Sequence, residues 1–143
     1  MENENEKPLT FFRFEDLRIY HKALDYVSWV YSMGKATNDD YLTKVFFERF
    51  LNSAQNIALN IAEGSSRNKS QFVYYLKMAK SSVRECVVFS TIAESKRLFS
   101  NSAFDDSKNS LMEMTKMIGA LIGSLQRSVK PGEIIDDDEE DMI

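Results

Sequence analysis

The alternation of apolar and polar positions along the chain predicts four long amphipathic helices. Apolar residues recur at steps of three and four over about 15–33, 39–63, 68–98 and 102–130, the spacing that places them on one helix face. The predicted inner stripes are Leu17, Tyr20, Leu24, Val27 and Tyr31, then Leu42, Phe46, Phe50, Ala54, Ile57 and Ile61, then Phe72, Leu76, Ala79, Val83, Cys86, Ser90 and Ala93, and finally Leu111, Thr115, Ile118, Ile122, Leu125 and Val129. No stretch shows the alternation typical of a strand bounded by hairpin turns, so we expect none.

The connections between these segments are short, and short connections make antiparallel neighbours. Gly34 and Gly64 are predicted helix stops, Thr37 with Asp40 resembles a capping box, and Asn68 begins the third helix. The sequence therefore predicts an all-α, up-down-up-down antiparallel four-helix bundle at 12–130. A flexible N-terminal segment, 1–11, and a disordered acidic C-terminal tail, 131–143, are expected to flank it.

Charge is distributed unevenly over the 143 residues. The net charge is −4, with −2 in 1–10 and −7 in 131–143, so 11–130 carries +5. A basic body with an acidic tail can bind polyanions, and the tail then competes for the same surface. The alternative is a solvated surface with a tail that keeps the protein soluble.

Composition narrows the possible chemistry. One Cys excludes an internal disulfide, and with only one His a Cys/His zinc site in a single chain is not expected. The start of the chain has no apolar secretory region, and no apolar run is long enough to span a membrane. The lone Cys86 fits a reducing compartment. We therefore expect a cytoplasmic protein with no membrane partner, no cofactor and no metal site.

Several aromatic residues fall outside the predicted inner stripes. They are Trp29, Phe47, Tyr74, Tyr75 and Phe89. Contiguous exposed apolar surface usually marks an interface, so we expect the protein to associate with itself. The alternative is that these rings lie at the flanks of the core inside one copy.

Two stretches resemble a known family. The opening FRFEDLRIYHKAL, 12–24, is similar to the start of the bacterial four-helix bundle proteins first noticed as products of intervening sequences in 23S rRNA genes, whose members are often labelled ribosomal-protein-like. The stronger match is NIALNIAEGSSRNKSQF, 56–72, continued by LKMAKSSVRE, 76–85. Members usually carry an Arg pair about eight residues before the Asn of N-I-A-E-G, where this sequence has Leu51 and Asn52.

The resemblance implies a bundle that assembles as a homo-oligomeric ring, commonly a homopentamer, without established enzyme activity. It also implies relatives among the accessory factors of diversity-generating retroelements, which resemble basic pentameric barrels that bind nucleic acid and a reverse transcriptase. The partners to consider are therefore other copies of the chain, RNA or DNA, and a nucleic-acid enzyme. We expect no enzyme and no catalytic residue, because Glu63 and Glu85 have no neighbouring His or nucleophile motif to support acid–base chemistry.

The motif residues Asn60, Glu63, Gly64 and Arg67 are expected to build the turn after the second helix. Asn60 and Glu63 share a helix face, and we expect them to hydrogen-bond the start of a neighbouring helix. The candidate nucleic-acid-binding residues are Arg49, Arg67, Lys69, Lys77, Lys80 and Arg84. Three of them recur at steps of three and four, so they line one face that could contact phosphates, with Tyr74 and Tyr75 nearby for base stacking. The alternative is a solvated face whose tyrosines fill a subunit interface.

Overall fold

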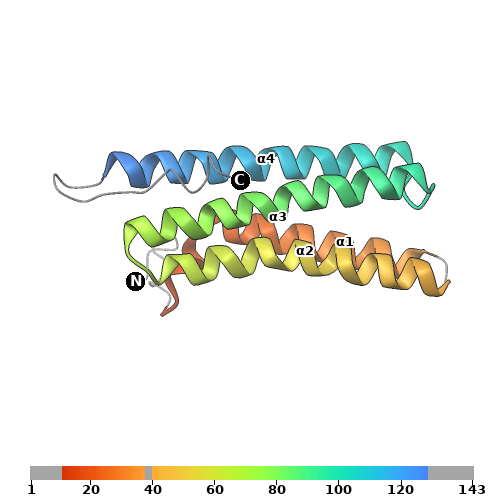
Figure 1. Ribbon diagram of the computed structural model, residues 1–143, viewed down its shortest axis with the longest axis horizontal. Coiled ribbons are helices and arrows are strands. Elements are labelled where there is room, and N and C mark those ends of the chain that lie inside the picture. Colours follow the sequence, from red (N-terminus) through yellow and green to blue (C-terminus); the bar gives the residue numbers. More distant parts are fainter. Residues whose placement is uncertain (1–10, 38–39, 129–143) are drawn as a thin grey trace, which may run out of the picture.

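The computed structural model describes residues 11–37 and 40–128. A short 3-10 helix, η1 (Arg13–Asp16), precedes α1 (Arg18–Ala36), α2 (Tyr41–Ser65), α3 (Lys69–Ser95) and α4 (Asn101–Arg127), and the described residues contain no strand. The four long helices lie side by side along the long axis of the molecule (Figure 1). The predicted all-α antiparallel four-helix bundle is confirmed. The predictions for 131–143 and for all of 1–11 except Phe11 lie outside the described residues.

Consecutive helices form the main packing contacts: α1 with α2, α2 with α3, and α3 with α4. The contact that closes the bundle, between α1 and α4, is smaller. It includes an ion pair in which Lys22 Nζ lies 2.9 Å from Glu113 Oε2. No helix in the described ranges combines the length and the apolar character that crossing a membrane requires.

Side-chain caps set the starts of three helices. Asn68 accepts a hydrogen bond from the Gln71 amide at 2.9 Å, as the sequence predicts, and Ser100 accepts one from Ala103 at 3.0 Å. The predicted capping role of Thr37 is wrong. Asp40 caps α2 by accepting from the Thr43 amide. These bonds satisfy amides that have no partner within the helix.

The prediction that glycines stop the first two helices is wrong. α1 continues past Gly34 to Ala36, and α2 continues past Gly64 to Ser65. A Cβ at Gly34 would lie 3.3 Å from Cβ of Phe47, so this glycine lets α1 and α2 approach closely.

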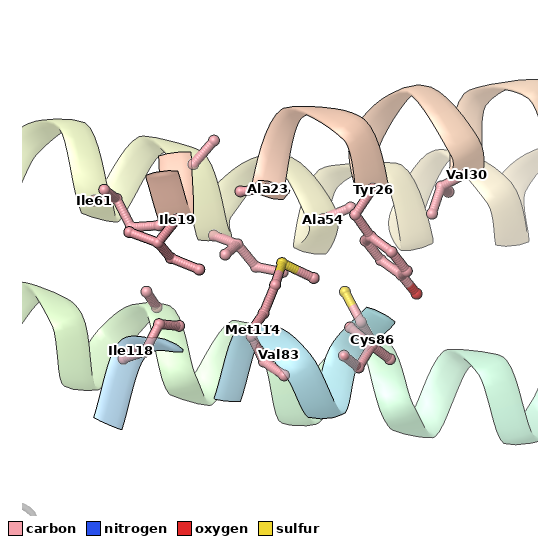
Figure 2. Close-up of a cluster of buried hydrophobic side chains, with 14 of the residues drawn as sticks. Ile19, Ala23, Tyr26, Val30, Ala54, Ile61, Val83, Cys86, Met114 and Ile118 are labelled. Atoms are coloured by element: carbon pink, nitrogen blue, oxygen red, sulfur yellow. The ribbon is translucent and has the colours of Figure 1, made fainter. Parts of the chain in front are cut away.

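The core is built mainly on the predicted stripes of α2 and α3. Figure 2 shows side chains of α1 and α2 pointing toward those of α3 and α4. The buried members of the two predicted stripes are Phe50, Ala54, Ile57, Ile61, Leu76, Ala79, Val83, Cys86, Ser90 and Ala93. Leu42, expected on the α2 stripe, is 72% exposed because it lies in the first turn of the helix, beyond most of the core. In α4, Met114 is buried in place of the predicted Thr115.

The buried face of α1 is shifted by about one residue from the predicted one. Its buried residues are Ile19, Ala23, Tyr26 and Val30. The predicted Leu24 and Tyr31 are 38% and 56% exposed. Three buried hydroxyl groups form a hydrogen-bonded series with α1 in this rotation. The Tyr26 hydroxyl lies 2.7 Å from Ser107 Oγ, which lies 2.6 Å from Ser90 Oγ. Only the observed rotation of α1 gives the Tyr26 hydroxyl this partner, and a buried polar group without one is costly.

Most aromatic residues expected outside the core lie within it. Phe47 is buried, and Trp29 and Phe89 are half-buried. Trp29 stacks on Tyr26 and Phe89 stacks on Phe50, with ring centroids 5.8 Å and 5.3 Å apart. These three rings do not form an exposed interface, because the core is wider than a single stripe per helix.

Candidate functional site

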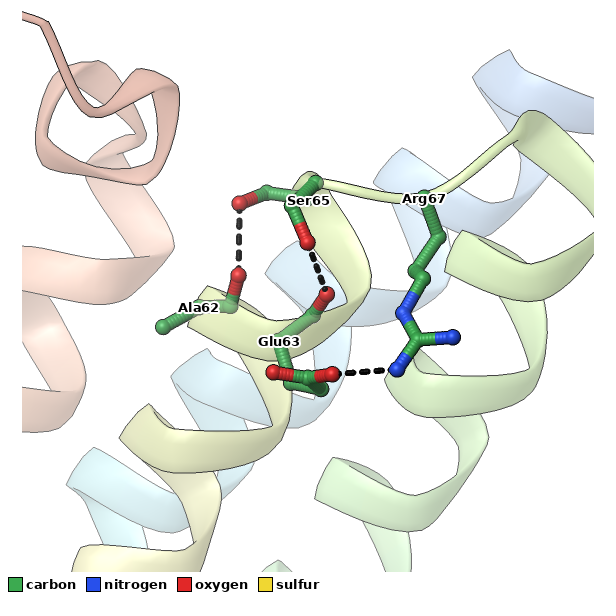
Figure 3. A network of polar contacts seen from close by, with 5 residues as sticks. Ala62, Glu63, Ser65 and Arg67 are labelled. Carbon is green, nitrogen blue, oxygen red and sulfur yellow. Dashed lines mark hydrogen bonds and ion pairs between the residues drawn. The ribbon is translucent and has the colours of Figure 1, made fainter.

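The family-motif turn joins the end of α2 to the start of α3. The Ser65 hydroxyl donates to the Ala62 carbonyl at 2.8 Å, and the Ser66 hydroxyl donates to the Glu63 carbonyl at 2.9 Å. The Glu63 carboxylate pairs with the Arg67 guanidinium (Figure 3). Backbone bonds also close the turn, from the Ser66 amide to the Glu63 carbonyl at 3.4 Å and from the Arg67 amide to the Gly64 carbonyl at 3.0 Å. The turn is thus held by its own side chains and backbone.

Gly64 has a packing role in this turn. It lies inside α2 and is buried. A Cβ there would lie 2.6 Å from Cβ of Tyr75 and 3.0 Å from Cδ1 of Phe72. Since real Cβ atoms do not approach so closely, only glycine lets the start of α3 pack against the end of α2 at this distance.

The other motif residues also act locally. The Asn60 side chain donates to the Asn56 carbonyl at 2.8 Å, within its own helix, so the expected bond to a neighbouring helix is not found for Asn60. Arg67 lies over the ring of Tyr75, 5.4 Å from its centroid. The hydrogen bond to Glu63, followed by the charge interaction with Tyr75, raises the pKa of Arg67. The contacts of these residues are therefore local, and the charge of Arg67 is balanced by Glu63.

Four of the predicted basic residues share one side of α3. Lys69, Lys77 and Lys80 are half-buried and Arg84 is exposed. At 3.6 residues per turn, the four positions span about 80° of the helix circumference. The Lys69 ammonium donates to the Ser128 carbonyl at 2.9 Å, so this side of α3 borders the end of α4.

α4 adds two cations that the sequence analysis missed. Lys116 and Arg127 are exposed and lie eleven residues apart, close to three helical turns, so they share one side of α4. Neither 69–84 nor 114–127 contains an Asp or Glu. We define the basic face as six cations on these two adjacent helices, four on the side of α3 that borders the end of α4 and two on the solvent side of α4: Lys69, Lys77, Lys80, Arg84, Lys116 and Arg127. The run without acidic residues in the fourth helix is the sequence signal that could have identified Lys116 and Arg127 as part of the basic face.

The remaining two predicted basic residues are not part of this face. Arg49 is exposed on α2, and α3 lies between α2 and α4 in Figure 1. Arg67 belongs to the turn and pairs with Glu63. The structure thus brings together four of the six candidates and separates two.

A line of apolar side chains is exposed on another side of α3. We call Tyr74, Met78, Val88 and Ile92 the outer stripe. Their exposed fractions are 46%, 39%, 58% and 39%. At 3.6 residues per turn the four positions span about 80° of the helix circumference, on the side away from the buried residues. Of the five aromatic residues expected at an interface, Tyr74 alone is exposed and belongs to this stripe.

The described residues bring together no group of three or more His, Cys, Asp or Glu placed to hold a metal ion. Cys86 is buried, and burial raises the pKa of its thiol to about 12, with a smaller contribution from the charge of Glu85. The thiol is therefore protonated at neutral pH. Burial likewise raises the pKa of Tyr26.

The fold and the motif turn define a class, the all-α four-helix bundle proteins. Within that class, the chain belongs to the family described as 23S rRNA-intervening sequence protein, which matches residues 15–120. The matched range includes the motif turn, α3 and most of α4. No curated protein matches the chain.

Proposed function

We propose that the protein is a non-enzymatic, cytoplasmic assembly module whose copies form a homo-oligomeric ring. The outer stripe is the observation that supports association, because it places four large apolar side chains in line on the side of α3 opposite the core. Removing apolar surface from water is worth about 25 cal/mol per Å². A second copy that covers this stripe would gain that free energy. A ring of five copies is what the family resemblance implies.

Light scattering on the full chain tests this proposal. We expect the wild type to give a mass several times 16.5 kDa, and a double variant carrying Met78→Glu and Ile92→Glu to give a smaller one. The matched control is Met112→Glu, which places the same charge at a Met that is 50% exposed on α4. It should leave the mass unchanged. A monomeric wild type, or an equal loss of mass in the control, would count against the proposal.

A second candidate function is supported by the basic face. We propose that the protein binds RNA or DNA there as an accessory factor, with a nucleic-acid enzyme as a further partner. Six cations on two adjacent helices, with no carboxylate in the two runs that carry them, suit a phosphate backbone. In a ring, every copy adds another such face. Tyr74 and Tyr75 lie on the same helix, and aromatic rings can stack on unpaired bases.

Binding of a single-stranded RNA oligonucleotide, measured by fluorescence anisotropy between about 50 and 200 mM salt, tests the second candidate. A variant carrying Lys77→Gln and Lys80→Gln should bind more weakly, and its salt dependence should fall by about one per lost phosphate contact. Lys96→Gln, at the far end of α3, is the control and should bind like the wild type. Equal binding by all three proteins would overturn the assignment of this face.

A further inference from the structure

We propose that the acidic segment 131–143 docks on the basic face and competes there with nucleic acid. The inference rests on the second function proposed above. It assigns the basic face an occupant from the same chain, which would regulate the access of nucleic acid to these cations.

Charge complementarity is the first argument. Segment 131–143 contains seven acidic and no basic residues, for a net charge of −7. The basic face has six cations. The described residues as a whole carry 16 basic and 11 acidic residues, so their excess of +5 is concentrated in the two acid-free runs of α3 and α4.

The position at which the described chain ends is the second argument. α4 ends at Arg127, and the Ser128 carbonyl accepts a hydrogen bond from Lys69. The chain therefore leaves the bundle between two members of the basic face. Only residues 129–130 separate this point from the acidic segment.

Chain length allows the acidic segment to reach the whole basic face. Asp136 follows Ser128 by eight residues, which span up to about 27 Å when extended. The distance along α3 from Lys69 to Arg84 is about 22 Å, at 1.5 Å per residue. The six consecutive acidic residues at 136–141 can thus lie beside any of the α3 cations.

The covalent link makes such docking effective even if each ionic contact is weak. Individual exposed ion pairs contribute about 0–1 kcal/mol. A short tether, however, holds its segment at an effective concentration in the millimolar range. A phosphate backbone must then displace a local polyanion before it can reach the same cations.

Charge-neutral variants of the full chain test the competition. We would replace the acidic run by Asp136→Asn, Asp137→Asn, Asp138→Asn, Glu139→Gln, Glu140→Gln and Asp141→Asn. At low salt we expect this protein to bind the RNA oligonucleotide about tenfold or more tightly than the wild type. The control carries Glu2→Gln, Glu4→Gln and Glu6→Gln, which removes negative charge at the other end of the sequence, and it should change affinity far less. The tail variant removes six charges and the control three, so gains in proportion to these numbers would overturn the proposal, because they would reflect net charge alone.

Carbodiimide cross-linking of the full chain tests the docking without RNA. This reagent joins a carboxylate directly to a neighbouring Lys amine. We expect mass spectrometry to find links from 136–141 to Lys77, Lys80 or Lys116, and few to the distant Lys96. Added RNA should suppress these links. Links spread evenly over all lysines would overturn the docking.

The two measurements separate failure of this inference from failure of the nucleic-acid function. If the wild type binds RNA through the basic face but neutralising 136–141 changes nothing, the inference is wrong and the function stands. If neither protein binds RNA, the function is wrong. In that case the cross-links alone test whether the acidic segment docks. Links concentrated on the basic face would support docking, and links spread over other lysines would contradict it.

Discussion

Gly64 illustrates, at the scale of one residue, how the packing around a motif glycine differs from the helix stop that the sequence predicts. A glycine near a helix end usually supplies a left-handed backbone. Here it supplies space, because Cβ of Tyr75 lies where its own Cβ would be. A sequence cannot distinguish these two needs, since both select the residue without a side chain.

We predict that Gly64→Ala lowers the free energy of unfolding by about 1–3 kcal/mol, the usual cost of forcing a methyl group into a packed site. The clash is with Cβ of Tyr75, which cannot move without its backbone. The control is Gly119→Ala in α4, where no described heavy atom would lie within 4 Å of the new Cβ. That change should be neutral or stabilising, because Ala favours a helix. Urea denaturation measures both, and equal effects would contradict the packing role.

Cys86 gives a prediction about pH. Its pKa rises from 9.0 to about 12 in the folded protein because the thiol is buried. The contribution of this group to stability is therefore complete below pH 9 and is lost as pH rises toward 12. We expect the stability advantage of the wild type over Cys86→Ala to shrink by about 1 kcal/mol between pH 8 and pH 10. Urea denaturation at the two values tests this, and an unchanged difference would mean that the thiol is not buried as described.

At the scale of the element, the helices were predictable and the rotation of α1 was not. Its segment has apolar residues on two adjacent stripes, so periodicity alone could not choose between them. The choice depends on the neighbours, since Tyr26 reaches Ser107 on α4 only in the observed rotation. In α3, by contrast, all the predicted stripe residues except Phe72 are buried, and the prediction is confirmed.

Two substitutions in α1 distinguish the observed face from the predicted one. Ile19 is 4% exposed and Leu24 is 38% exposed. We predict that Ile19→Ala costs about 2–5 kcal/mol of unfolding free energy, whereas Leu24→Ala costs about 1 kcal/mol or less. Both remove a similar aliphatic side chain from the same helix, so each controls for the other. A larger loss of unfolding free energy for Leu24→Ala than for Ile19→Ala would favour the buried face that the sequence predicts.

At the scale of the whole molecule, polar and apolar surfaces are separated on α3. The basic face borders α4, while the outer stripe lies on the side away from the core. One helix can therefore contact a second copy and a polyanion through different sides. The two proposed functions use different sides of α3, and Tyr74 is the one residue named for both.

Assembly also has a thermodynamic consequence. If copies associate only when folded, raising the protein concentration stabilises the fold by mass action. We predict that the thermal midpoint of the wild type rises with concentration, and that the double variant Met78→Glu and Ile92→Glu loses this dependence. Circular dichroism over a hundredfold range of concentration measures it. A midpoint independent of concentration in the wild type would argue against a ring that forms through the outer stripe.

The sequence by itself determined the helices, their antiparallel order and the motif turn, because apolar spacing and the Asn68 cap are local properties of the chain. It also identified four of the six basic-face residues, since they share one helix. Lys116 and Arg127 could not be grouped with the α3 cations, because the sequence does not show that α4 packs against α3. The same reason applies to Gly64, to the rotation of α1 and to the burial of Phe47. Each depends on the distance between two helices, which tertiary packing alone decides.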